Sequence, residues 1–472
     1  MIIKKMALKF KVIRECDYMK FVLFGAGLLG KSYYKLLKDK YDIVCFADNN
    51  PSKHGTKLLD LIIINPAEII NKNLNVIITS SYYLEIAQQF YAMGIREFYI
   101  PNKYGIAELS RIDLNEYGEI KEIPNKVCII GHYNAGALSK ALISYNPYND
   151  MEVVLVKDSK KDSEYFYHYL SSSLVITQGS EHCGNKKSIE LWHGFTIKTL
   201  YFMSHEKSER SLSISKNEIF NNKTAVCSMS HLYSVFMGYC LRLDFEKFVI
   251  TGYPRNDMIF KSDGKAALEK LVGPIKQRKI LFYAPTYRES LYTNNGNSAA
   301  FISDMTGFDE KIFNDFLSEN NILFLYKKHT VQLSRKMFND SNNIIEVTDD
   351  MLHANDMDLY EILNGVDGLV SDYSSIIIDF LLTDKPIILT PLDLEEYSST
   401  RGLMMEPYDA WMPGEIALDY NQFQQAVSDS LFGEDKFKKD RERLKRITHK
   451  YADGNSSERV LALARELLEL DK

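Results

Sequence analysis

The chain has 472 residues, of which 45% are hydrophobic and 25% charged, and its formal net charge is −6 at pH 7. This composition excludes a disordered or fibrous protein, and the acidic balance argues against a general nucleic-acid binder, which carries a basic excess. The length exceeds what one hydrophobic core supports, so it predicts two or three domains.

The cysteines and the apolar runs predict a cytoplasmic protein. The thiols show no paired spacing of the kind found in zinc or redox motifs, and several lie within apolar runs; they are Cys16, Cys45, Cys128, Cys183, Cys227 and Cys240. No uncharged apolar run reaches the roughly 18 residues of a membrane-spanning helix. Residues 1–18 are basic without the apolar centre of a signal peptide, so we interpret them as an extension. The basic run 436–450 indicates a solvated helix face or a contact with an anionic membrane surface.

Residues 19–102 predict a small Rossmann-like domain. The strand KFVLF leads into a glycine-rich turn and the helix 31–40, and a second strand, 41–47, ends at an acid. The fingerprint residues are Gly25, Gly27, Gly30 and Asp48. In a dinucleotide site such glycines let the backbone approach a pyrophosphate, and the acid binds a ribose. The following DNNPSKHGTKLLDLIIINPAEI resembles small Rossmann-like modules attached to bacterial surface-glycan enzymes, and nothing here suits nicotinamide chemistry.

Residues 103–124 are charged and weakly patterned, which predicts a linker, and strands then alternate with helix-length segments. This alternation predicts two doubly wound parallel sheets, one in 125–247 and one in 248–472. The candidate strands are Val127–Ile130, Val153–Val156, Leu174–Thr177, Ile189–Trp192, Phe248–Gly252, Lys279–Tyr283, Ile322–Tyr326, Gly368–Val370 and Pro386–Leu389, and the closing helices are Asn421–Leu431 and Ser456–Leu470.

Five polar stretches follow predicted strands, and the chemistry-bearing side chains concentrate in them. They are Glu190–Lys198, Thr251–Asp257, Ala284–Arg288, Lys327–His329 and Leu369–Leu382. An accessible His at a strand end, such as His193, can take a proton from a hydroxyl, although for an isolated His packing against Trp192 is the preferred interpretation. The rigid turn before Arg255 aims a guanidinium at a phosphate or carboxylate. Together the stretches supply what a transferred phosphoryl group requires, namely positioning and neutralised charge.

The stretch Leu369–Leu382, LVSDYSSIIIDFLL, predicts a buried strand, a polar turn and a helix that restarts at Ser374 and Ser375. The two hydroxyls can cap this helix by accepting its first free N–H groups, and the helix N-terminus can seat a phosphate. Asp379 lies four residues after Ser375 and therefore on the same helical face. The alternative is an ordinary strand-to-helix turn of an α/β protein.

In consistent order, the motifs ELWHGFTIK, TGYPRND, FYAPTYR, KKH, LVSDYSSIIIDFLLTDKPII and DGNSSER resemble the CDP-glycerol glycerophosphotransferase family, which includes teichoic-acid and capsule polymerases. The resemblance extends over about residues 125–465. It implies an α/β fold of GT-B architecture, in which two facing Rossmann-like halves enclose the active site. It also implies transfer of glycerol phosphate from CDP-glycerol to an acceptor hydroxyl, with release of CMP.

The resemblance also assigns roles to residues of this chain. His193 looks like the base that deprotonates the acceptor, and His329 looks like the group that contacts the donor phosphates. Asp379 matches a position that could hold donor hydroxyls, whereas Ser374 and Ser375 match positions facing the pyrophosphate. The positions that match donor-binding residues are Gly194, Thr196, Arg255, Pro285, Thr286, Arg288, Lys327, Lys328, Asp372, Ser374, Ser375 and Asp379.

Two departures from the family pattern bear on the prediction. Family members usually carry a proline near the WHG motif and after the KxH motif, whereas this chain has Thr196 or Ile197 and Thr330 there. The turns, and donor selectivity with them, can therefore differ. The segment 199–222, often an amphipathic anchor in membrane-acting relatives, is polar, and Tyr201–Met203 offers little apolar area.

We therefore predict a cytoplasmic polyol-phosphate transferase of surface-polymer synthesis, with a CDP-activated polyol as donor and a glycan or lipid-linked glycan as acceptor. Peripheral contact with the inner face of the membrane and oligomerisation stay open, and no nucleic acid is expected. No metal-ligand cluster is visible, so no cofactor is required, while Mg²⁺ could accompany the donor. The alternatives are a GT-B glycosyltransferase that uses a nucleotide sugar and a non-catalytic nucleotide-binding scaffold. The sequence does not distinguish CDP-glycerol from CDP-ribitol, or one transfer from polymerisation.

Overall fold

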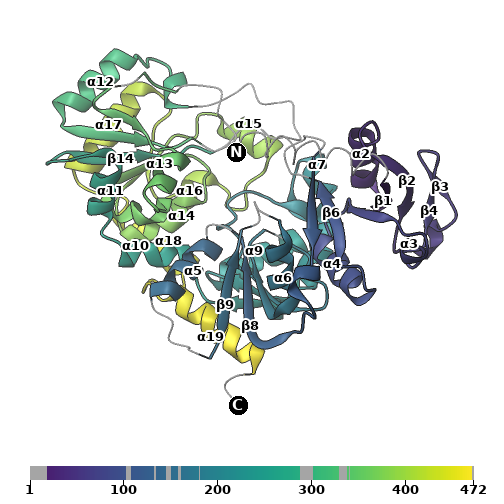
Figure 1. Ribbon diagram of the computed structural model, residues 1–472. Coiled ribbons are helices and arrows are strands. Elements are labelled where there is room, and N and C mark those ends of the chain that lie inside the picture. Colours follow the sequence, from purple (N-terminus) through teal and green to yellow (C-terminus); the bar gives the residue numbers. More distant parts are fainter. Residues whose placement is uncertain are drawn as a thin grey trace, which may run out of the picture.

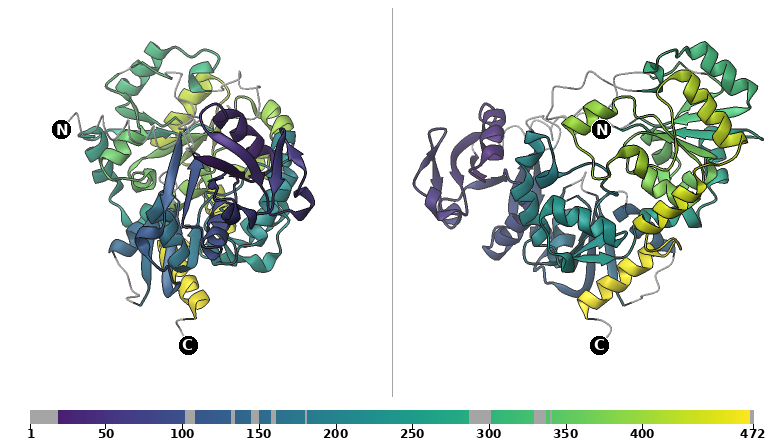
Figure 2. Two further views of the ribbon diagram at one scale, coloured as in Figure 1. Left: turned by 45° about the vertical axis from the view of Figure 1, so that its right-hand side comes forward. Right: turned by 180° about the vertical axis from the view of Figure 1, so that it is seen from behind.

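The computed structural model describes residues 19–101, 108–131, 134–144, 150–157, 161–179, 181–286, 301–328, 337–339 and 341–469. They form three α/β units, each built on one sheet, which we call the N-terminal, middle and C-terminal units. The middle unit lies between the other two (Figures 1 and 2).

The N-terminal unit is a seven-stranded sheet in the order β3-β4-β2-β1-β5-β6-β7. Its strands are β1 (Lys20–Phe24), β2 (Asp42–Ala47), β3 (Lys57–Leu58), β4 (Leu61–Ile64), β5 (Asn75–Ile78), β6 (Glu97–Pro101) and β7 (Leu109–Asp113), and its helices are α2 (Leu28–Leu37), α3 (Glu68–Asn71) and α4 (Tyr83–Ala92). Strand β7 lies inside the predicted linker and pairs antiparallel with β6. The linker prediction was therefore wrong for these residues. Strand β7 lies at the edge of the sheet and has only one buried side chain, so its sequence is charged and lacks the apolar pattern of a strand.

The middle unit is a six-stranded parallel sheet in the order β13-β12-β11-β10-β8-β9. Its strands are β8 (Ile123–Ile130), β9 (Glu152–Val156), β10 (Ser172–Thr177), β11 (Lys187–Glu190), β12 (Ala225–Ser228) and β13 (Phe248–Ile250), and its helices are α5 (Asn134–Ser144), α6 (Ser163–Ser171), α7 (Lys207–Arg210), α8 (Ser213–Asn221) and α9 (His231–Leu241). Strand β13 was assigned to the following half, but it pairs with β12 and so completes this sheet.

The C-terminal unit is a second six-stranded parallel sheet, in the order β16-β15-β14-β17-β18-β19. Its strands are β14 (Lys279–Tyr283), β15 (Ile322–Tyr326), β16 (Ile344–Glu346), β17 (Gly368–Ser371), β18 (Ile387–Leu389) and β19 (Glu415–Ile416). Its helices are α10 (Asp257–Lys261), α11 (Gly264–Val272), α12 (Glu310–Glu319), α13 (Asp349–Ala354), α14 (Ile376–Phe380), α15 (Leu394–Thr400), α16 (Tyr408–Trp411), α17 (Tyr420–Phe432) and α18 (Lys438–Thr448). The last helix, α19 (Ser456–Leu468), returns to pack on α5 and β10 of the middle unit (Figure 1, yellow).

The three units are packed together through shared hydrophobic cores. One core runs from the N-terminal unit into the middle unit, where Phe98 meets the ring of Phe166 with centroids 5.1 Å apart. A larger core joins the middle and C-terminal units and contains both Trp192 and Ile377. The N-terminal unit is thus docked on the middle unit through α4 and α6 instead of being tethered by a free linker. Among the described residues, no helix is both long and apolar enough to cross a bilayer.

Candidate active site

The loop after β11 carries the candidate base. Strand β11 ends at Glu190, two residues before the predicted end, and the next residues form an irregular turn. Trp192 in this turn has a φ of 54°, the left-handed region that bulky side chains rarely adopt. Its N–H donates to Glu190 Oε1 at 3.0 Å, and its carbonyl accepts from Asn134 Nδ2 at 2.8 Å. Buried polar side chains therefore hold Trp192 from both ends.

His193 follows at the tip of this loop and is exposed. Its ring packs on Trp192 with centroids 4.1 Å apart, and its carbonyl accepts from Arg255 Nη1 at 2.7 Å. Surrounding protein removes water from one side of the ring, and this desolvation, followed by the charge of Arg255, lowers the pKa of His193 to about 4. The imidazole is therefore neutral at pH 7 and able to accept a proton. Packing on Trp192, the alternative interpretation of this residue, coexists with access to solvent.

The C-terminal unit has a topological switch point where the strand order reverses. Strands β14 and β17 are neighbours in the sheet, yet the chain leaves them toward opposite edges, and ligands of open α/β sheets bind at such a point. Asp372 joins the two loops here, because its Oδ1 accepts from the N–H groups of Thr286 at 2.8 Å and Tyr373 at 2.6 Å. Asp372 and Pro285 are buried beneath the turn, so they fix its shape.

The turn after β17 differs from the prediction in one respect. Helix α14 spans only Ile376–Phe380, and neither Ser374 nor Ser375 caps it through its side chain. The prediction of a hydroxyl cap was wrong because Ser375 already has helical dihedral angles, which keep its hydroxyl away from the following N–H groups. Both serines are half-exposed, and neither hydroxyl bonds to another described residue. They are left available to a ligand at the switch point.

The two loops meet at Gly194. A Cβ at this glycine would lie 2.8 Å from Ser375 Oγ and 3.1 Å from Arg255 Nη2, so no larger residue fits there without a shift of its neighbours. Its φ of 154° is also one that favours glycine. The close approach brings the His193 loop of the middle unit against the serine turn of the C-terminal unit. Thr196, two residues on, is buried and bonds within its own loop, to the carbonyl of Lys198.

Behind this contact, a buried ion pair links the same two units. Arg255 Nη2 donates to Asp379 Oδ2 at 2.7 Å, and the same carboxylate accepts from Asn256 Nδ2 at 3.0 Å and Tyr360 OH at 2.6 Å. The Tyr360 ring also lies 4.5 Å from the guanidinium carbon. Burial opposes the charge of Arg255, but Tyr360 and Asp379 raise its pKa above the ordinary value. Asp379 is fully buried, and its two carboxylate oxygens accept these three hydrogen bonds from protein groups.

Asp257, which follows Asn256, connects the C-terminal helix to the segment that carries Arg255. Its carboxylate accepts from the N–H groups of Ser456 at 2.8 Å and Ser457 at 2.7 Å, which begin α19. A second connection lies on the other side of the His193 loop, where Thr199 N donates to Gly402 O at 3.1 Å and Arg401 pairs with Glu206 at 2.5 Å. The loop is therefore held to the C-terminal unit on both sides.

Two predicted cations lie at the carboxyl end of β15. Lys327 pairs with Asp349 at 2.7 Å and Lys328 pairs with Glu346 at 3.1 Å, so both charges are already partly balanced. The remaining predicted residues of this edge, Arg288 and His329, lie outside the described residues. Sequence reasoning missed Asn134, Asn256 and Tyr360, of which only Asn256 stood inside a recognised motif.

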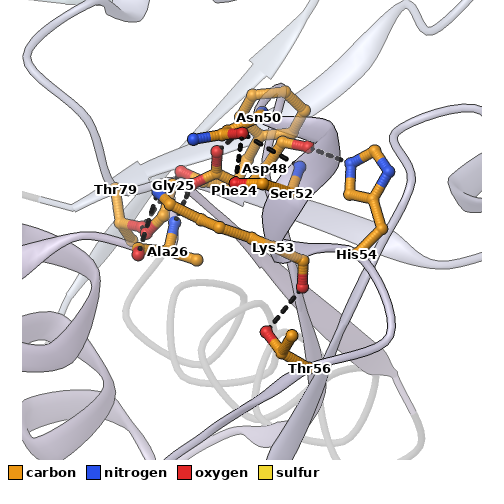
Figure 3. Close-up of polar contacts among 10 residues, drawn as sticks. All are labelled: Phe24, Gly25, Ala26, Asp48, Asn50, Ser52, Lys53, His54, Thr56 and Thr79. Atoms are coloured by element: carbon orange, nitrogen blue, oxygen red, sulfur yellow. Dashed lines mark hydrogen bonds and ion pairs between the residues drawn. The ribbon is translucent and has the colours of Figure 1, made fainter.

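In the N-terminal unit, the predicted fingerprint acid, Asp48, bonds to residues of the neighbouring loops. Asp48 Oδ2 accepts from Ala26 N at 2.9 Å and from Lys53 Nζ at 2.8 Å, and Oδ1 accepts from Asn50 N at 2.9 Å (Figure 3). Burial opposes ionisation, but Lys53 and these N–H groups lower the pKa of Asp48. The carboxylate that the fingerprint assigns to a ribose is thus engaged in an ion pair.

The glycines of that loop have different surroundings. A Cβ at Gly25 would lie 3.1 Å from Thr79 O, and one at Gly30 would lie 1.9 Å from Gly25 O, so close packing requires both. A Cβ at Gly27 would meet nothing within 4 Å. The side of the loop at Gly27 is open, and a nucleotide on it stays a prediction. Among the described residues, no three His, Cys, Asp or Glu side chains gather as a metal site.

Two facing Rossmann-like units, with the loop of a neutral histidine in one against the switch-point turn of the other, define a transferase-like protein of GT-B architecture. The solved structure of the H548A variant of the wall teichoic acid polymerase TagF shares this fold, with a TM-score of 0.60 and 17% identity over 74% of this chain and 90% of that chain. Residues 149–465, more than half of the chain, match the family CDP-glycerol:poly(glycerophosphate) glycerophosphotransferase. The chain belongs to that family. Residues 17–100 match a separate family, C2185-like, N-terminal.

Curated relatives agree with this assignment. The ribitol-phosphate polymerase TarL of Staphylococcus aureus is 29% identical over 284 residues, which cover 59% of this chain and 47% of that protein. The teichoic acid glycerol-phosphate primase of Bacillus spizizenii is 28% identical over 242 residues, covering 51% of this chain and 57% of that protein. The chain thus spans about half the length of the curated relatives it matches.

Proposed function

We propose that the protein transfers glycerol phosphate, or a related polyol phosphate, from a CDP-activated donor to an acceptor hydroxyl and releases CMP. The product belongs to a teichoic-acid-like or capsular surface polymer. The observation that carries the proposal is the contact at Gly194, which brings the loop of neutral His193 against Ser375 in the turn after β17. Family membership and relatives that act on both glycerol phosphate and ribitol phosphate support it.

In the proposed reaction, His193 accepts the proton of the acceptor hydroxyl while the oxygen attacks the phosphorus that bears the polyol. The bond from this phosphorus to the bridging oxygen breaks, and its electron pair leaves with CMP. Such a transition state depends on positioning and on stabilising negative charge on the departing oxygens. Ser374 and Ser375 would donate to these oxygens, with Lys327 and Lys328 as nearby charges. His329 and Arg288 enter the proposal from the family resemblance alone.

The sequence suggested that Arg255 and Asp379 contact the donor, but we propose a different role for them. Because each is buried and bound to the other, we propose that they hold the two loops in register instead of touching the donor. Arg255 then acts on the reaction through the carbonyl of His193.

A donor panel tests the proposal. Pure protein is incubated with CDP-glycerol, CDP-ribitol or UDP-sugars and a polyol-phosphate primer, and the released nucleotide and the mass of the product are measured. We expect CMP and a product heavier by one or more polyol phosphates. Release of UDP with sugar addition would instead identify a glycosyltransferase, and donor binding without turnover would identify a scaffold.

Replacing Ser374 and Ser375 with alanine should weaken donor binding more than it weakens folding. Each hydroxyl that donates to a charged phosphate contributes about 1.5–3 kcal/mol, so each loss should raise the Kd for CDP-glycerol roughly 10- to 100-fold. Calorimetric titration measures the Kd, and thermal melting measures the fold. The adjacent serines Ser398 and Ser399 on α15 provide the matched control, since their alanine variants should bind the donor normally. An unchanged Kd for the Ser374 and Ser375 variants would make the turn purely structural.

The pH profile of the reaction should lack the acid limb of an ordinary histidine base. A base must be unprotonated, and the pKa of His193 is lowered to about 4 by desolvation and by Arg255. The fraction of His193 in the active form is therefore constant from about pH 5 upward, in contrast to a histidine that titrates near 6.5. Measurement of kcat/KM from about pH 5 to 8, with melting temperatures as a control, checks this. An inflection near pH 6.5 would contradict it.

We also propose that the protein works as a peripheral protein at the inner face of the cell membrane. The segment after the His193 loop was expected to offer little apolar surface, yet Met203, Leu212 and Ile214 are exposed, the last by 67%. The cations Lys207 and Arg210 lie in the same segment. Co-sedimentation with vesicles of anionic lipid, compared with neutral vesicles, tests the proposal, and equal recovery in the supernatant of both would refute it.

A further inference from the structure

Three backbone groups of the His193 loop are held by buried side chains. Glu190 accepts from the N–H of Trp192, Asn134 donates to the carbonyl of Trp192, and Arg255 donates to the carbonyl of His193. A non-glycine residue in the left-handed region persists only where its surroundings determine it. These three contacts are what fix the direction in which the His193 ring leaves the loop.

Asn134 differs from the other two residues because it joins the loop to Arg255 itself. Its Nδ2 donates to Trp192 O at 2.8 Å, and its Oδ1 accepts from Arg255 N at 3.1 Å. The side chain is fully buried at the start of α5, the helix that follows β8. One donor and one acceptor at this spacing require an amide, since a carboxylate has no donor to offer.

We infer that Asn134 is a positioning residue for His193, because its amide bridges the strained Trp192 to the backbone of Arg255. Arg255 is in turn bound to Asp379 of the C-terminal unit. Asn134 thus fixes the His193 loop relative to the unit that presents Ser374 and Ser375, without touching a substrate. The inference rests on the proposed function, in which His193 is the base.

The test is Asn134→Asp, which keeps the shape and the acceptor but places a carboxylate oxygen against the carbonyl of Trp192. Because small displacements of a reacting group cost about 100-fold in rate, we expect kcat for CMP release to fall roughly 100-fold. The Kd for CDP-glycerol should stay within about twofold, since Asn134 is fully buried and touches no ligand. Should Asn134→Asp fail to melt cooperatively, the smaller, neutral Asn134→Ser takes the same measurements.

The matched control is Asn217→Asp. Asn217 lies in the same unit, and its amide donates to the carbonyls of Leu241 and Arg242, away from the His193 loop. Its variant loses similar bonds but should keep kcat. Equal losses of kcat in the two variants would overturn the positioning role and leave a general effect on the fold.

A second readout does not depend on activity. The chain has 2 tryptophans, so a Trp411→Phe background leaves Trp192 as the sole indole, in contact with the His193 ring. Asn134→Asp should change the fluorescence emission of Trp192, and Asn217→Asp should not. Unchanged emission together with unchanged kcat would overturn the inference. Altered emission in a protein that releases CMP from no donor would defeat the proposed function while leaving the placement of the loop by Asn134 intact.

Discussion

Replacing His193 with alanine will reduce CMP release by about 10²- to 10⁴-fold, the usual contribution of a general base, while the protein stays folded. The side chain is exposed and makes its main contact with the face of Trp192, so its removal opens no buried cavity. Its carbonyl, which Arg255 binds, remains in place. The donor should therefore still bind. The measurements are initial rates of CMP release, the Kd for CDP-glycerol and the melting temperature.

His231→Ala is the control for this prediction. His231 is an exposed histidine of the same unit and the first residue of α9, and its ring stacks on Phe245. It belongs to none of the loops of the site. Its variant should release CMP at the normal rate. If His193→Ala also turned over at a near-normal rate, His193 would be removed from the mechanism and the proton would have to go to another group.

The strands were the most predictable part of the fold. Parallel strands are buried on both faces, so they appear in the sequence as short apolar runs between polar turns. Lys279–Tyr283 and Ile322–Tyr326 are predicted and observed with the same bounds, because ILFY and ILFLY are almost entirely buried. The loops of the site could be located for the same reason, since each begins where such a run ends.

The partners of the polar residues could not be predicted in this way. The sequence placed Arg255 and Asp379 in separate motifs and suggested a ligand for each, whereas they bind each other across 124 residues of chain. Tyr360, which donates a hydrogen bond to Asp379, lies in no recognised motif. Likewise, β13 pairs with β12 and α19 packs on α5 and β10, so both belong to the middle unit. A local sequence pattern does not indicate such long-range contacts.

Among the residues around the Arg255–Asp379 pair, replacement of Asp379 with alanine should cause the largest loss of stability. It leaves the Arg255 guanidinium buried without its counter-charge, and breaking one side of a buried pair costs about 3–5 kcal/mol. Asn256 and Tyr360 lose their acceptor at the same time. Urea unfolding should show this loss. Asp429→Ala, which removes the partner of the exposed Lys436 at the protein surface, should cost far less.

The double variant Arg255→Met with Asp379→Leu separates stability from function. Apolar side chains of similar volume often replace a buried ion pair without loss, so much of the free energy of unfolding should return. Activity should not return, because methionine cannot donate to the carbonyl of His193. Recovery of both would mean that the pair serves only packing. Recovery of stability alone would mean that a costly buried charge is kept at this position because it holds the base of one unit against the serine turn of the other.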